Sequence, residues 1–135
     1  MFLENTSLIW VNKENSQDYN YKIEPSLNDS CVIVWEKGMY SVFSQITFKF
    51  KKESHNTAAR HAIIRKVSNS PRMVQQKPIY VAENRTQDVT ETSTLIAFPM
   101  VEEGDKICVI VAPLNQVYVS PVDNMLTLFK MVAVR

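Results

Sequence analysis

The sequence predicts an all-β domain, folded as a sandwich or a barrel. Runs in which apolar and polar residues alternate, the pattern of strands buried on one side, follow one another along the chain. Clusters of Asn, Ser, Pro and charged residues separate these runs, as expected of turns. Of the 135 residues, 45% are hydrophobic and 21% are charged, which is typical of one globular unit. We therefore expect a single domain over residues 1–135, with residues 1–6 interpreted as a stalk or an appended segment.

The longest strand is expected at residues 38–51, where the alternation is strict. Its core face carries Tyr40, Val42, Ser44, Ile46, Phe48 and Phe50. Shorter strands are expected at 31–35, 62–67, 79–82, 92–101, 106–112 and 125–134, with turns at 68–72 and 101–105. Residues 11–28 are polar and irregular, and we interpret them as a long surface loop with one short edge strand at most.

One face of the sheet carries more apolar residues than a solvated face should. Phe43 is an isolated aromatic on the polar face of the 38–51 strand, and the 125–134 strand is apolar on both faces. Antiparallel sandwich strands normally keep one side polar. Either a long loop covers this face or a second copy of the chain does. The pattern favours self-association, since exposed apolar patches usually mark interfaces and closed symmetry buries them.

Composition excludes several classes of function. The formal net charge is +1, and no basic excess indicates binding to nucleic acid. The short run Lys49, Lys51 and Lys52 is interpreted as a solvated strand end. Only Gly38 and Gly104 are glycines, so glycine-rich phosphate-binding loops are absent. No apolar run is long enough to span a bilayer, and the first ten residues lack the pattern of a signal peptide.

Three motifs resemble the ligands of the tumour necrosis factor (TNF) superfamily. The run GMYSVFSQITF at residues 38–48 resembles the family's Gly-Leu-Tyr-x-x-Tyr-Ser-Gln-Val-x-Phe strand. The run FPMVEEGDKI at 98–107 is similar to its Phe-x-Leu-x-x-Gly-Asp-x-Leu turn, and LFKMVAV at 128–134 is similar to its terminal Phe-Gly-x-x-x-Leu strand. The motifs follow the family's order and spacing, so the resemblance covers the chain from about residue 30 onward.

The resemblance implies a jelly roll of two five-stranded antiparallel sheets that assembles as a homotrimer. Such ligands bind cysteine-rich receptors of the TNF-receptor family in the grooves between protomers, and clustering of these receptors starts signalling. Short loops resemble those of divergent T-cell co-stimulatory members. The matching positions imply a trimer interface made by Phe43, Phe98, Leu128, Val132 and Val134.

The chain also departs from the family pattern. Ser93 or Thr94 stands where the family often has an aromatic residue, and Lys130 replaces a small residue, which implies a looser or differently packed trimer axis. Receptor contacts are expected from loops beside the groove between protomers. Because Tyr, Arg and Met are enriched at interface cores, the candidates are Tyr19, Arg72, Met73 and Tyr118.

The two cysteines, Cys31 and Cys108, are too few for a zinc site within one chain. Each alternates with apolar core positions, so both are expected to point away from the core. In the fold that the resemblance implies, their strands are neighbours, which favours a Cys31–Cys108 disulfide over two free thiols.

Three acceptor triplets, at Asn5, Asn28 and Asn84, are candidate N-glycosylation sites and favour an extracellular protein. The resemblance implies a secreted form or the ectodomain of a type II membrane protein, in which case contact with the membrane comes only through an upstream anchor outside this chain.

We expect no enzyme, metal or cofactor. His55 and His61 are the only histidines and are interpreted as surface residues, and the acidic turn at 102–105 is interpreted as solvated. Two other functions stay open. A C1q-like trimeric recognition head would share the jelly roll. A carbohydrate-binding or enzymatic jelly roll such as a cupin would need a cluster of histidines, and two isolated ones argue against it.

Overall fold

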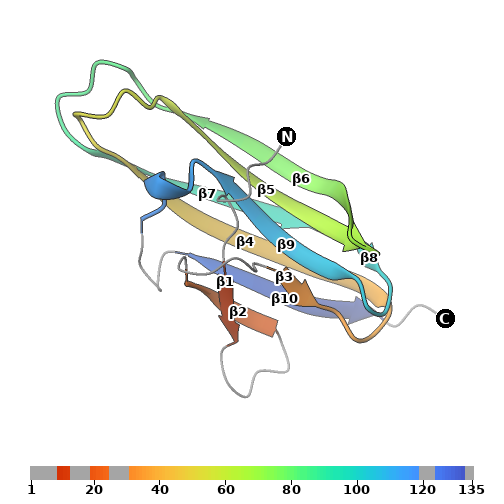
Figure 1. Cartoon of the computed structure of the whole chain (residues 1–135). Helices are drawn as coiled ribbons and strands as arrows, with labels where there is room; N and C mark the ends of the chain where they lie inside the picture. The colour runs from red at the N-terminus through yellow and green to blue at the C-terminus, as the bar shows by residue number, and fades with distance from the viewer. Residues whose placement is uncertain (1–8, 13–18, 25–30, 119–123, 133–135) are drawn as a thin grey trace.

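The computed structural model describes residues 9–12, 19–24, 31–118 and 124–132. These residues form two antiparallel sheets packed face to face (Figure 1). The larger sheet contains, in spatial order, β1 (Ile9–Asn12), β2 (Tyr19–Glu24), β10 (Met125–Val132), β4 (Gly38–Phe50) and β7 (Val89–Ala97), with β8 (Met100–Val101) also paired to β4. The smaller sheet contains β3 (Cys31–Ile33), β9 (Lys106–Ala112), β5 (Ala58–Val67) and β6 (Ser70–Tyr80). The prediction of an all-β sandwich is confirmed.

The core lies between the two sheets and contains the predicted face of β4. All six residues from Tyr40 to Phe50 on that face are buried. The smaller sheet contributes the inward residues of β5 and β9, among them Ile63, Ile107, Val109 and Val111. A one-turn 3-10 helix, η2 (Leu114–Gln116), follows β9 and leads towards β10.

The N-terminal region contains more strand than expected. Residues 11–28, interpreted as a loop, include the end of β1 and all of β2. β1 pairs with β2, and β2 pairs in turn with β10, from Met125 opposite Lys22 to Leu128 opposite Tyr19. Both strands join the larger sheet, so the described residues form sheets of six and four strands, where five in each were expected. The polar sequence does not indicate these strands, because β2 is held in the sheet by pairing with β10, which is far away in the sequence.

The turn expected at 68–72 is shorter than predicted. Only Ser68 and Asn69 form it, with φ angles of 50° and 66°, and Val67 pairs with Ser70 across it. Two positive φ values suit the right-handed twist of a two-residue hairpin. β6 therefore begins at Ser70, and the following proline is tolerated because β6 is an edge strand.

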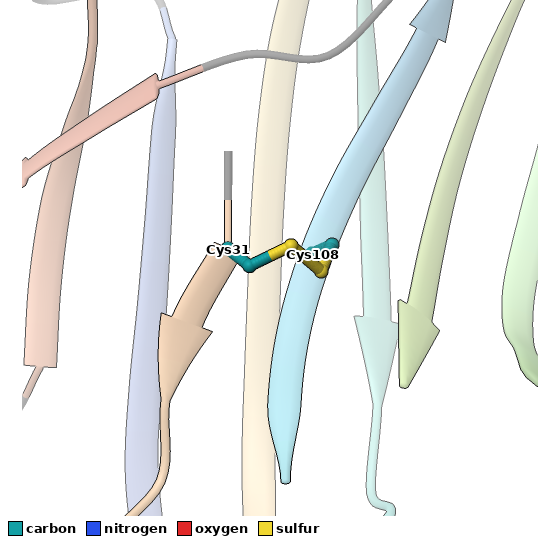
Figure 2. The surroundings of a disulfide bond; sticks show 2 residues. All are labelled: Cys31 and Cys108. Carbon is teal, nitrogen blue, oxygen red and sulfur yellow. A yellow bond between two sulfur atoms is a disulfide. The ribbon is translucent and has the colours of Figure 1, made fainter. Parts of the chain in front are cut away.

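A disulfide joins Cys31 of β3 to Cys108 of β9, as favoured by the sequence (Figure 2). The two residues lie directly opposite each other in the register, with their Cα atoms 4.2 Å apart. Their neighbours Val32, Ile107 and Val109 face the core, so both cysteines point to the other side of the smaller sheet. The bond therefore joins β3, which has only three residues, covalently to β9.

His61 lies in the core, which corrects its interpretation as a surface residue. It is fully buried between Ala59 and Ile63 on the inward face of β5. Its Nε2 lies 2.8 Å from the Oγ of Ser44 in β4, and its Nδ1 lies 2.9 Å from the Oγ of Ser93 in β7. A neutral imidazole has one donor and one acceptor nitrogen, so one serine hydroxyl donates to the ring and the other accepts from it.

Burial lowers the pKa of His61 to about 3, and the positive charge of Lys77 contributes to the shift. Lys77 lies opposite His61 in the register of β5 and β6, while Val111 lies opposite it on β9. The ring is therefore neutral at physiological pH. Its two hydrogen bonds connect the smaller sheet to the larger sheet inside an otherwise apolar core.

The acidic turn also differs from expectation, because Asp105 is buried rather than solvated. Its Oδ2 lies 2.7 Å from both Nε and an η nitrogen of Arg65, and it accepts a 2.9 Å hydrogen bond from the backbone N–H of Glu102. Gly104, with φ of 88°, closes the turn. Asp105 therefore stabilises the turn that precedes β9. Glu102 and Glu103 remain exposed.

Candidate functional site

Large apolar side chains remain exposed on the outward face of the larger sheet. Phe98 is 57% exposed, Ile96 52% and Phe129 49%, while Met39 is exposed and Phe43 is half-buried. We call these five residues the outer apolar patch. Four of them lie on β4, β10 and β7, three strands that are neighbours in the sheet, and Phe98 directly follows β7.

Strand register brings the outer apolar patch together. Phe43 lies opposite Ile96 on β7 and opposite Thr127 on β10. Phe129 lies opposite Ser41, which is two residues from Phe43 on the same face of β4. Directly opposite and diagonal neighbours on one face of a sheet are within contact distance of large side chains. The patch is therefore one continuous surface rather than scattered residues.

Two of the residues predicted at a trimer interface, Phe43 and Phe98, lie in the outer apolar patch. The prediction for Leu128 is wrong, because its side chain is fully buried in the core. Val132 lies in β10 opposite Met39, and its side chain is outside the described part of the structure, as is all of Val134.

The sequence did not reveal Ile96 and Phe129 as surface residues. β10 is apolar on both faces, so its alternation alone does not say which face is buried. Lys130 pairs with Tyr40 and lies beside a bulge in β10, and its Nζ forms a 2.9 Å ion pair with Glu36. This lysine is therefore held by a neighbouring loop at the end of the sandwich.

The sequence model of the TNF (Tumour Necrosis Factor) family matches residues 9–131, which include every strand described except the last residue of β10. The chain belongs to the TNF family. No curated protein matched the sequence. The match does not favour the C1q-like alternative, and the TNF family is a family of cytokines rather than enzymes.

In this TNF-family domain the predicted receptor contacts do not form one cluster. Arg72 and Met73 are exposed on β6 next to the Ser68–Asn69 turn. Tyr118 is exposed at the other end of the sandwich, where its backbone N–H donates to the carbonyl of Thr47. The ten residues of β5 separate these ends by roughly 30 Å. Tyr19 lies in β2, and its side chain is outside the described part.

At the end of the sandwich near Tyr118, one arginine holds two loops of the TNF-family domain together. One η nitrogen of Arg85 donates to the carbonyls of Asn56 and Ala82, and the other donates to those of Lys51 and Ser54 at 2.6 and 2.7 Å. Its guanidinium carbon also lies 5.9 Å from the ring centroid of Phe50. Arg85 thus joins the loop after β4 to the loop after β6.

We expect Arg85→Ala to lower the free energy of unfolding by about 2 kcal/mol, because charge-assisted hydrogen bonds to four carbonyls are lost. Arg85→Lys should lose nearly as much, since an ammonium cannot reproduce the planar fork of donors. Urea denaturation gives the change. Arg72→Ala, which removes an exposed arginine from β6, is the matched control. If Arg85→Ala lowers the free energy of unfolding no more than this control does, the hydrogen bonds of Arg85 contribute little to stability.

Asn84 is exposed in the loop that precedes β7, beside Arg85. Asn5 and Asn28 lie outside the described residues. Within the described ranges, no group of three or more His, Cys, Asp or Glu side chains is arranged to hold a metal ion. In the same ranges, no helix is both long and apolar enough to cross a membrane.

Proposed function

We propose that this chain is a cytokine-type ligand that forms a homotrimer and binds cysteine-rich receptors of the TNF-receptor family. Clustering of receptors around the trimer would start the signal. The ligand acts outside the cell, as a secreted protein or as a cell-surface ectodomain, and Asn84 is a proposed N-glycosylation site. The Cys31–Cys108 disulfide suits such an oxidising compartment.

The outer apolar patch is the observation that supports the trimer most strongly. Four large apolar residues on three adjacent strands, together with Phe98 directly after β7, form a continuous surface that is exposed in the described part of the chain. Contiguous exposed apolar surfaces on soluble proteins usually mark association sites. Self-association with closed symmetry removes such a surface from water without leaving a free copy of it.

A charge placed in the outer apolar patch should prevent association. In Phe129→Glu the carboxylate would be buried without a partner in the trimer, which costs several kcal/mol at each interface. We expect this variant to be monomeric at micromolar concentration by sedimentation velocity. Tyr80→Glu changes an exposed aromatic on β6 in the same way and should leave the trimer intact. If Phe129→Glu and Tyr80→Glu assemble equally, the patch is not the interface.

A second experiment addresses receptor binding. Tyr19, Arg72, Met73 and Tyr118 remain the proposed contacts, with Arg72 and Met73 at the end of the protomer opposite Tyr118. Purified trimer would be titrated against isolated ectodomains of the TNF-receptor family by surface plasmon resonance. Saturable binding to at least one ectodomain is expected, and it should be lost in the Phe129→Glu monomer, because the receptor groove requires two protomers. Equal affinity of monomer and trimer would contradict this role of the groove.

A further inference from the structure

A small cavity lies where β4 ends, beside the turn that follows β9. Its volume is about 250 Å³, and it is lined by Lys49, Lys51, Ser54, Asn115, Gln116, Val117 and Tyr118. Backbone pairing fixes one wall, because Val117 forms a β-bridge with Phe48 and the Tyr118 N–H donates to the carbonyl of Thr47 at 2.8 Å. The cavity is therefore part of the folded sandwich rather than an accident of long side chains.

The lining carries more positive than negative charge. Lys49 Nζ lies 5.7 Å from the ring centroid of Tyr118 and 4.0 Å from Oδ2 of Asp88. The other oxygen of Asp88 accepts a hydrogen bond from the backbone N–H of Lys52, so this carboxylate already has two partners. Among the described residues, no carboxylate lies within 4.0 Å of the Lys51 ammonium. A concave site with unmatched ammonium charge attracts anions.

An amide in the lining also needs a partner. The Oε1 atom of Gln116 is buried and has no hydrogen-bond partner in the described part of the chain. Its Nε2 lies 3.5 Å from Oδ1 of Asn115, at the outer limit of a hydrogen bond. Neither end of the amide is firmly held. The Nε2 donor, held only by this long contact, is therefore available to an incoming oxygen.

We propose that this cavity receives the side-chain carboxylate of an Asp or Glu residue of the receptor. The inference rests on the proposed function and adds the chemistry of one contact to it. Two ammonium groups, the phenol of Tyr118 and the amide of Gln116 supply donors to one small space. The volume lies below that of typical small-molecule sites and suits a single side chain. Tyr118 gives the aromatic wall that interface anchors commonly pack against.

Adjacent lysines allow a matched test. Lys51 lines the cavity and Lys52 does not, although both are exposed. Lys51→Glu and Lys52→Glu therefore change the net charge equally at neighbouring positions. With a receptor ectodomain that binds the unaltered trimer, we expect Lys51→Glu to weaken binding tenfold or more and Lys52→Glu to weaken it less than threefold. Light scattering and urea denaturation would confirm that both variants remain folded trimers.

Each other outcome overturns a defined part of the proposal. Equal losses in the two variants would indicate general electrostatic attraction and no cavity contact. Binding unchanged by Lys51→Glu would remove the cavity from the interface and leave the proposed function intact. If no ectodomain binds the unaltered trimer, the proposed function fails and this inference fails with it. If sialidase treatment of the receptor abolishes the difference between the variants, the carboxylate belongs to a glycan and the proposal is overturned.

Discussion

Replacing His61 with alanine is expected to lower the free energy of unfolding by about 5 kcal/mol. The substitution leaves the hydroxyls of Ser44 and Ser93 buried without their partner, at roughly 1–3 kcal/mol each. It also leaves a cavity in a fully buried site between the sheets. Urea denaturation of the two proteins measures the difference.

A triple variant, Ser44→Ala, His61→Leu and Ser93→Ala, separates these causes. Replacing every partner of a buried network with apolar groups is much less costly than orphaning some of them. We expect the triple variant to be more stable than His61→Ala. If it is less stable, the hydrogen bonds contribute more than the desolvation argument allows.

His61 should also make the fold sensitive to acid. Its pKa is about 3 in the folded protein and 6.5 in the unfolded chain, so the unfolded chain binds the proton more tightly. The contribution of neutral His61 to the free energy of unfolding is therefore fully present above pH 6.5. It is lost as pH falls from 6.5 towards 3. Between pH 7 and pH 5 the loss from this one residue is about 2 kcal/mol.

The neutral variant His61→Gln is the control for that loss, since carboxylates elsewhere titrate in both proteins. The unaltered chain should lose about 2 kcal/mol more than His61→Gln between pH 7 and pH 5. If the free energy of unfolding changes with pH in the same way for both proteins, His61 is not the titrating group.

Reducing the Cys31–Cys108 disulfide is expected to lower the free energy of unfolding by about 4 kcal/mol. The bond closes a segment of 77 residues, and the loop-closure entropy that it removes from the unfolded chain has this magnitude. The urea midpoints of the oxidised and reduced forms of one sequence give the change directly. This comparison avoids the cavity that a substitution at the buried Cys108 would create.

The double variant Cys31→Ala and Cys108→Ala checks the same conclusion in a second way. It should be at least as unstable as the reduced protein, because it loses the bond and also buried sulfur. A reduced form within 1 kcal/mol of the oxidised form would contradict the entropic argument. In that case β3 would be held mainly by its backbone pairing with β9.

The parts of the fold that were predictable are those where local pattern and burial agree. β4 shows strict alternation, and its inward residues are buried as expected. The alternation of Cys31 and Cys108 with core residues likewise predicts that both point away from the core, whereas their pairing was implied by the family resemblance. These features depend on the period of two that a strand imposes on its side chains.

The parts that were missed depend on partners distant in sequence. The sequence around His61 is that of an ordinary polar position, and only the fold brings Ser44 and Ser93 within hydrogen-bond distance of its ring. β10 is apolar on both faces, so only packing reveals that Leu128 is buried and Phe129 exposed. Arg85 lies in a polar loop, and nothing near it in the sequence indicates that it binds four carbonyls.

The mass of the unaltered protein in solution tests the proposed trimer most directly. Sedimentation equilibrium or light scattering at micromolar concentration should give three times the chain mass of 15.5 kDa, or more if glycans are attached. Enzymatic removal of the glycans should bring the value to that multiple. A stable species at the mass of one chain would contradict the trimer and leave the outer apolar patch without its proposed partner.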